Sequence, residues 1–164
     1  MIDPHGAYER IIRLLDEHQV EYTLFHHRPI LSYADAEAVG RDVGFRGVEG
    51  KCLVLTVGDR FVVYTTTAGM RVDFKRIRDH LGARKVRLAS AEELRAHFGA
   101  EPGNAYPFGF AANVRILVDP ALYEQEWLLF SPALHTATVQ IRGRDLPRAS
   151  RALPNIVEET AFNL

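Results

Sequence analysis

A lysine and a glycine-framed turn are the residues of this chain best suited to hold a small polar ligand. Lys51 opens the strongly apolar run 51–57, so a strand there would carry one cation at its mouth. Later in the chain, residues 103–109 read Gly-Asn-Ala-Tyr-Pro-Phe-Gly. Glycines in such a turn let backbone N–H groups approach a ligand where a side chain would block it. Together the two features predict a site for a carbonyl-bearing or phosphorylated group, although Lys51 taken alone also fits a strand end that faces water.

Other side chains with reactive or stacking groups fit structural roles as well as chemical ones. Cys52 lies inside the apolar run, which predicts burial, a raised pKa and a place in a pocket wall or core. Ser131 and His135 flank a Pro-Ala-Leu turn and are candidates for a pocket rim, with no acidic residue nearby to orient the histidine. Tyr106 and Phe108 could stack on a base, while packing of the turn is expected of at least one of them.

Several well-known catalytic motifs are absent. A phosphate-binding P-loop would need glycine at position 45 and Ser or Thr after the lysine, where this chain has Phe45 and Cys52. The sequence has no Gly-x-Gly-x-x-Gly, no Gly-x-Ser-x-Gly and no His-Glu-x-x-His. The absence of these motifs argues against a nucleoside triphosphatase, a dinucleotide-binding enzyme, a serine hydrolase with the usual nucleophile elbow and a catalytic zinc site. No metal and no cofactor are therefore expected.

Composition indicates an ordinary globular chain. Its 164 residues are 47% hydrophobic and 25% charged, with a net charge of −1, and no apolar run approaches the length that spans a bilayer. The first six residues lack the features of a signal peptide. We therefore expect a cytoplasmic protein with no membrane partner and no DNA partner. Residues 71–87 carry seven basic side chains against two aspartates, which fits either a phosphate-binding face or a solvated helix.

The elements that must position these residues follow from periodicity, capping residues and turns. Helices are predicted over about 4–18, 32–39, 73–81, 90–98 and 145–153, and strands over about 22–25, 51–57, 60–67, 85–88, 114–118, 128–130 and 138–141. Gly58-Asp59 predicts a tight hairpin between the two longest strands. Helices and strands mixed in this way, without strict alternation, predict one compact α+β domain over residues 1–164, with a mixed, curved or barrel-like sheet flanked by helices.

Several strings, in this order, resemble the YbaK/ProX family of free-standing aminoacyl-tRNA editing domains, which are related to the insertion domain of bacterial prolyl-tRNA synthetase. The strings are His27-x-Pro29 with the helix that Ser32 begins, Gly47–Lys51 before the apolar strand, Asp73-Phe74-Lys75, Lys85–Ser90 before Glu92-Glu93-Leu94, Gly103-x-x-x-Pro107-Phe108-Gly109, Val114–Asp119, and Phe130-Ser131-Pro132 leading to Thr138 and Asp145-Leu146. The likeness covers about residues 20–150.

The resemblance implies a compact α+β fold and a trans-acting deacylase. Such an enzyme hydrolyses the ester between a small, wrongly attached amino acid and its tRNA, which the resemblance implies is a proline tRNA, and so acts as a second sieve in translation fidelity. The attacking group would be water, oriented by the substrate's own 2′-hydroxyl, without a metal. The partners implied are a mischarged tRNA and an aminoacyl-tRNA synthetase. The alternative is a non-catalytic module that binds tRNA, a synthetase or an aminoacyl-like small molecule, and a general esterase is a third possibility.

The resemblance also implies roles for particular residues. Lys51 would pair with the phosphate or ribose end of the tRNA or steady the developing oxyanion, and the turn from Gly103 to Gly109 would offer N–H groups to the aminoacyl carbonyl. The residues expected to bind substrate are His27, Cys52, Asn104, Tyr106, Pro107, Phe108, Ser131 and His135.

Three of these positions depart from the family's pattern. Members that act on alanine typically carry Asn after the lysine and His before the later proline, where this chain has Cys52 and Ser131; His135 stands where Asn is common. The resemblance therefore implies the class of activity but not the amino acid removed, and a pocket lined by Cys and Ser would suit a different small or polar residue.

Overall fold

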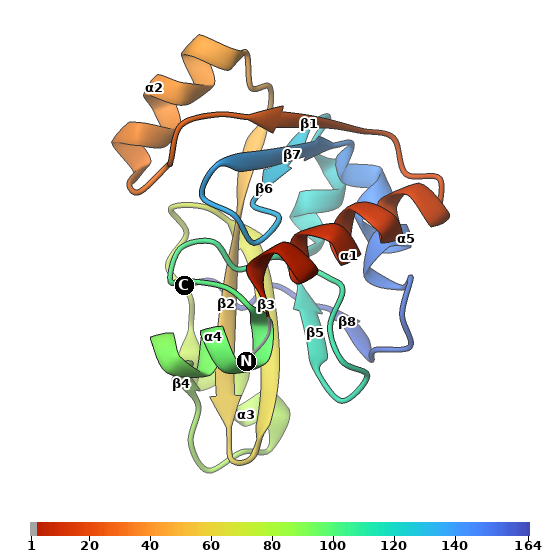
Figure 1. The fold of residues 1–164 in the computed structure, drawn as a ribbon. Coiled ribbons are helices and arrows are strands. Elements are labelled where there is room, and N and C mark those ends of the chain that lie inside the picture. The colour runs from red at the N-terminus through yellow and green to blue at the C-terminus, as the bar shows by residue number, and fades with distance from the viewer. Residues whose placement is uncertain (1–2) are drawn as a thin grey trace.

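The computed structural model describes residues 3–164, so Met1 and Ile2, part of the segment on which the signal-peptide prediction rests, lie outside the described residues. The described chain forms an eight-stranded mixed sheet with helices around it (Figure 1). The strands are β1 Tyr22–His26, β2 Val48–Val57, β3 Arg60–Thr67, β4 Arg87–Leu88, β5 Arg115–Val118, β6 Leu128–Phe130, β7 Ala137–Ile141 and β8 Val157–Glu159. The helices are α1 Pro4–Glu17, α2 Tyr33–Val43, α3 Phe74–Leu81, α4 Ala91–Phe98 and α5 Leu146–Ser150, with short 3-10 helices η1 Pro120–Glu124 and η2 Gly143–Asp145.

Strand β2 joins the two halves of the sheet. It pairs antiparallel with β3 along most of its length through the predicted hairpin, while its first two residues, Val48 and Glu49, pair in parallel with β6. The strand order is β1-β7-β6-β2-β3-β5-β8, with β4 added to the far end of β2. The predicted α+β fold with a mixed, curved sheet is confirmed (Figure 1).

The predicted helix boundaries are confirmed where a side chain or a glycine defines them. Ser32 and Asp73 cap the N-termini of α2 and α3, and Ser90 forms a reciprocal capping box with Glu93 at α4. Helix α3 ends at Gly82, which adopts φ +63° and so avoids the steric cost that a side chain would bear in the left-handed region.

The structure corrects several of the predicted elements. Helix α2 continues to Val43 instead of ending at residue 39, and Gly44 forms its C-cap. Lys51 is the fourth residue of β2 rather than its head, because Val48–Gly50 already pair with β6 and with the end of β3. Helix α5 stops at Ser150 instead of residue 153, since the chain must turn there to bring Val157–Glu159 alongside β5. That last strand, β8, was not predicted; it is too short and too polar for a periodic signal.

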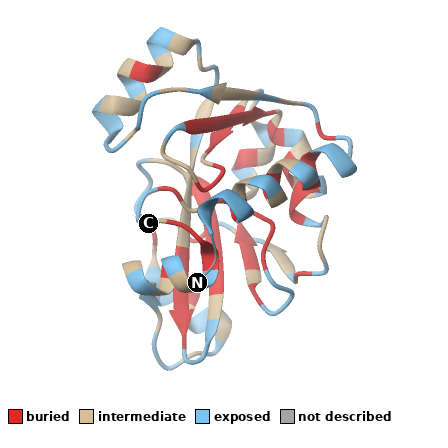
Figure 2. Cartoon of the chain, viewed as in Figure 1, coloured by how far each residue is buried: buried red, intermediate tan, exposed pale blue. Residues whose placement is uncertain are grey.

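Apolar side chains form two clusters, and the larger one includes residues of α1, α4 and most strands of the sheet. The smaller one holds α3 against Leu55, Tyr64 and Phe162. Helix α2 has a single buried residue, Val39, and Figure 2 shows this helix outside the buried body of the protein. Residues of α2 and of the sheet line the candidate site described below. No helix within residues 3–164 is long and apolar enough to cross a membrane.

Candidate active site

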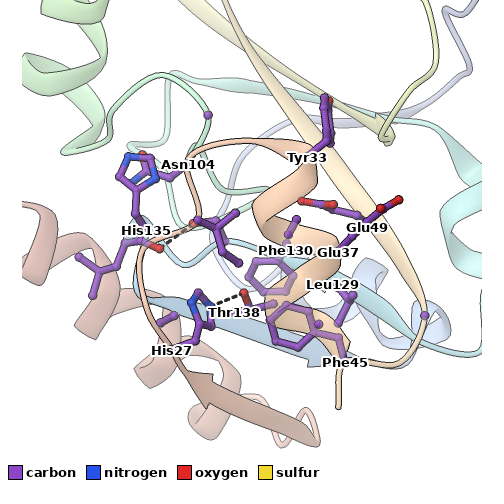
Figure 3. Close-up of a pocket in the computed structure, with 18 of the residues that line it drawn as sticks. His27, Tyr33, Glu37, Phe45, Glu49, Asn104, Leu129, Phe130, His135 and Thr138 are labelled. Atoms are coloured by element: carbon purple, nitrogen blue, oxygen red, sulfur yellow. Dashed lines mark hydrogen bonds between the residues drawn. The ribbon is translucent and has the colours of Figure 1, made fainter. Parts of the chain in front are cut away.

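Two adjoining cavities lie between α2, β2 and the loops after β1, α4 and β6. Their volumes are about 610 Å³ and about 510 Å³, and Figure 3 shows residues that line the larger one. Both are lined by Ile30, Tyr33, Glu49, Gly103, Ser131 and His135. This shared lining makes them two parts of one cleft.

Seven of the predicted site residues reach this cleft. Lys51, Cys52, Gly103, Ser131 and His135 line the smaller cavity, and His27 and Asn104 join the lining of the larger one. They come from three loops and one strand that are far apart in the sequence. The structure thus brings the lysine and the first half of the glycine-framed turn to one place.

Lys51 is held by the sheet and by the turn that follows β3. Its backbone is in register with Thr66 of β3, and its ammonium Nζ donates a hydrogen bond of 2.6 Å to the Met70 carbonyl oxygen. The neighbouring Ala68 N–H donates to the Glu49 carbonyl oxygen at 2.8 Å, which ties the same turn to β2. A cation fixed in this way at the cleft can stabilise negative charge without first being reoriented.

The glycine turn is tied to the loop after β6 by the buried amide of Asn104, which is 3% exposed. Its Nδ2 donates to the Ala133 carbonyl oxygen at 2.9 Å, and its Oδ1 accepts from the Glu101 N–H at 2.6 Å. Gly103, directly before it, has φ +95°, and its Cα faces open space. Asn104 therefore holds the two loops together, while Gly103 leaves the backbone accessible from the cleft.

Replacing Asn104 by alanine should cost about 2 kcal/mol of stability, because the Ala133 carbonyl and the Glu101 N–H lose their buried partner. Thermal unfolding measures this effect. Asn104→Asp is the matched variant, since its carboxylate can still accept from Glu101 but cannot donate to Ala133. If both variants unfolded at the wild-type temperature, the amide would not be what joins the loops.

His27 is oriented through both ring nitrogens. Nδ1 lies 2.7 Å from the Arg28 carbonyl oxygen, and Nε2 lies 2.8 Å from the Thr138 hydroxyl (Figure 3). Because a carbonyl oxygen only accepts, Nδ1 carries the proton, and in the neutral ring Nε2 accepts from Thr138. The ring also packs edge-on against Phe45. Both ring nitrogens are thus engaged within the protein. His27 is therefore better suited to form a wall of the cleft than to act as a general base.

Cys52 is held as a thiol. It packs against the larger apolar cluster and accepts a weak hydrogen bond from Thr65 at 3.7 Å, and burial raises its pKa to about 12. A thiol with so high a pKa is almost entirely protonated at neutral pH and is a poor nucleophile. Cys52 thus provides a wall of the pocket, as the sequence predicted.

Alkylation checks this assignment. We expect iodoacetamide at pH 8 to react with folded Cys52 on the order of 100-fold more slowly than with the same thiol in denaturant. The raised pKa also makes the folded state lose stability as pH rises from about 9, where the unfolded thiol ionises, towards about 12. Equal alkylation rates in the two states would show that the thiol is accessible and reactive.

The second half of the glycine-framed turn points away from the cleft, which corrects the expectation for four residues. Tyr106 is buried, and its hydroxyl donates to the Phe98 carbonyl oxygen at 2.6 Å. Phe108 packs against Phe130 in the core, and Pro107 is buried beside it. Gly109 faces α1, where its carbonyl oxygen accepts from Arg10. Aromatic residues in such a turn can point towards a ligand site or into the core, and here both Tyr106 and Phe108 point into the core.

Three residues that line both cavities were not predicted from the sequence: Ile30, Tyr33 and Glu49. Tyr33 is the first residue of α2 and stays exposed although it is aromatic. Glu49 precedes Lys51 by two positions in the strand, so their side chains project from the same face of β2. That spacing was the available signal for Glu49, but the predicted strand began too late to include it.

The basic stretch at 71–87 begins beside the cleft, directly after the Met70 carbonyl that holds Lys51. Part of its charge is engaged within the protein: Arg78 pairs with Asp79, Arg87 pairs with Glu93, and Arg76 lies over the Phe162 ring. Among residues 3–164, no group of three or more His, Cys, Asp or Glu side chains is arranged to hold a metal ion.

Comparison with known proteins places the chain in a family. Residues 31–149 match the family described as the aminoacyl-tRNA editing domain. The chain belongs to that family. This editing domain is 25% identical to the prolyl-tRNA editing protein ProX of Acetoanaerobium sticklandii, over 91% of this chain and 93% of that protein. It is 24% identical to the multifunctional Ser/Thr-tRNA deacylase ProXp-y of Escherichia coli K12, over 88% and 89% of the two chains.

A solved structure of a candidate trans-editing enzyme for prolyl-tRNA synthetase has the same fold. It superposes on this editing domain with a TM-score of 0.73 at 16% identity, covering 94% of this chain and 96% of the other. At that identity the likeness establishes the fold, which agrees with the sheet described above.

Proposed function

We propose that this protein is a trans-acting aminoacyl-tRNA deacylase, which hydrolyses the ester between a small mischarged amino acid and the terminal ribose of a tRNA. The observation that carries the proposal is the meeting of the Lys51 ammonium and the Gly103 turn at one cleft. Membership of the aminoacyl-tRNA editing domain family and the names of the two relatives support the same chemistry. We assign the activity to the cytoplasm, where tRNA is charged, and treat residues 1–164 as one editing domain.

In the proposed reaction the ester carbonyl lies between Lys51 and the backbone of the Gly103 turn. Water, oriented by the 2′-hydroxyl of the substrate, adds to the carbonyl carbon, and the Lys51 ammonium stabilises the negative charge that develops on the carbonyl oxygen. The bond to the ribose oxygen then breaks, and that oxygen takes a proton. The products are the free amino acid and a tRNA with its terminal hydroxyls restored.

The residues that line the cleft indicate that the rate enhancement comes mainly from positioning the ester, and not from a protein nucleophile. Cys52 is a partly buried thiol with a raised pKa, and the Ser131 hydroxyl donates to the Leu134 carbonyl oxygen at 3.2 Å within its own turn. Neither is arranged as an activated nucleophile. An aminoacyl ester is already reactive, so holding it beside water and a cation is sufficient chemistry for this site. We place the amino-acid side chain against Cys52, Ser131 and His135.

The test is multiple-turnover release of amino acid from seryl- and alanyl-tRNA(Pro) in water enriched in oxygen-18. We expect free amino acid with one heavy oxygen in its carboxylate and tRNA that can be charged again. Binding of the mischarged tRNA without release would contradict the proposal and favour a binding module. Equally efficient cleavage of p-nitrophenyl acetate would instead indicate a general esterase.

A further inference from the structure

Glu49 lies where the two cavities meet, and its backbone is fixed on both sides. It is in register with Leu129 of β6 in the parallel pairing, and its carbonyl oxygen accepts from the Ala68 N–H at 2.8 Å. Its side chain lines both cavities, and Figure 3 shows it on the β2 side of the cleft. The side chain therefore lines the cleft from a strand residue whose backbone is paired on both sides.

The carboxylate of Glu49 has no hydrogen-bond or ion-pair partner among the side chains of residues 3–164, and partial burial raises its pKa. Lys51 is the nearest candidate in sequence, on the same face of β2, but its ammonium is engaged with the Met70 carbonyl oxygen. A carboxylate that loses part of its hydration without gaining a partner costs stability. A positively charged ligand group would offset that cost.

Other charged residues around the larger cavity do not supply this partner. Glu37 of α2 lines it, and Figure 3 shows its carboxylate on the same side of the cleft as that of Glu49. Arg41, one helical turn after Glu37, also lines it and carries the opposite charge. Within residues 3–164 no ion pair joins Arg41 to Glu49, and burial alone, with no neighbouring charge, accounts for the raised pKa of Glu49. Glu49 is therefore an unmatched anion at the junction of the cavities.

We propose that Glu49 binds the α-ammonium group of the aminoacyl ester and makes the cleft selective for esters with a free amino group. This inference rests on the proposed deacylase function. Residues two apart in a strand are separated by roughly 6.6 Å, so Glu49 and Lys51 can flank one small ester. Lys51 faces the carbonyl oxygen, on which negative charge develops, and Glu49 faces the ammonium one carbon away from the carbonyl.

Binding of hydrolysis-resistant analogues tests the inference directly. The probes are 3′-(L-alanylamino)-3′-deoxyadenosine and its seryl counterpart, each paired with the analogue that has a hydroxyl in place of the ammonium (lactyl and glyceryl). We expect the wild-type protein to bind the ammonium form of at least one pair about tenfold more tightly than the hydroxyl form, as for one charged hydrogen bond. Glu49→Gln should bring that ratio close to one. Glu21→Gln, an exposed glutamate between α1 and β1, is the matched control and should keep the wild-type ratio.

A parallel assay compares hydrolysis of alanyl- with lactyl-tRNA and of seryl- with glyceryl-tRNA. The intrinsic reactivity of each ester cancels when the ratio in Glu49→Gln is divided by that in wild type. An unchanged ratio in Glu49→Gln, equal binding of both forms by wild type, or binding of neither would overturn the assignment. Ammonium-selective binding that Glu49→Gln abolishes, without release of amino acid from any tRNA, would support Glu49 and contradict the deacylase proposal.

Discussion

Replacing Lys51 by alanine is expected to slow release of the amino acid by about 100- to 1000-fold, the usual effect of removing one donor to a developing oxyanion. The Lys51 ammonium is the fixed cation that β2 brings to the cleft, and it is held there by the Met70 carbonyl oxygen. Its removal should lower the turnover rate at saturating tRNA more than it weakens binding, because the charge it meets develops during the reaction. Single-turnover deacylation at saturating enzyme measures this effect.

Two further variants define the role of Lys51. Lys51→Arg keeps the charge but replaces a compact ammonium by a planar group, so it should recover little of the activity. Lys75→Ala removes an exposed lysine on α3 and serves as the control, with a rate within about twofold of wild type. A Lys51→Ala protein that unfolds normally and still releases amino acid at the wild-type rate would remove Lys51 from the chemistry.

Replacing Gly47 by alanine is expected to destabilise the protein by about 3 kcal/mol and to lower its melting temperature by about 6–12 °C. Gly47 has φ +112°, and a Cβ there would overlap the Trp127 carbonyl oxygen. The same carbonyl accepts from the Val48 N–H at 3.0 Å, at the start of the parallel pairing between β2 and β6. Relieving the overlap would shift the strand that carries Glu49 and Lys51, so activity should fall together with stability.

Gly44→Ala is the matched control for that substitution. Gly44 also has a left-handed backbone, with φ +84°, but no atom lies within 4 Å of the position that a Cβ would take. Its replacement should therefore cost about 1 kcal/mol, from backbone strain alone. Equal melting temperatures of the two variants would show that overlap with the Trp127 carbonyl oxygen does not destabilise Gly47→Ala.

Local signals in the sequence were sufficient for most of the fold. Ser90 and Glu93 define the start of α4, Gly82 the end of α3, and Gly58-Asp59 the hairpin, because each of these effects involves atoms only a few residues apart. Pairing between distant segments gave no such signal. The parallel contacts of β2 with β6 and of β5 with β8 depend on the three-dimensional arrangement, which is why the start of β2 and all of β8 were missed.

The candidate site was predictable to a similar degree. Lys51 and Gly103 stood out by type and position, and the structure brings both to one cleft. The orientation of Tyr106 was not predictable, because its burial depends on Phe98 and Phe110, which contact it only after the fold has formed. Glu49 was missed for a related reason. It is a candidate binding residue because its carboxylate has no partner, and that depends on the surrounding structure and cannot be seen in the sequence.

The most direct measurement of the central claim is the initial rate of deacylation by the wild-type protein across a panel of correctly and wrongly charged tRNAs. The panel carries Ala, Cys, Ser, Thr and Pro, each on tRNA(Pro) and on its cognate tRNA. We expect rapid release of one small or polar amino acid, with prolyl-tRNA(Pro) spared. Hydrolysis of none of the panel by the folded protein, or of prolyl-tRNA(Pro) as fast as the others, would contradict an editing enzyme built around Lys51 and the Gly103 turn.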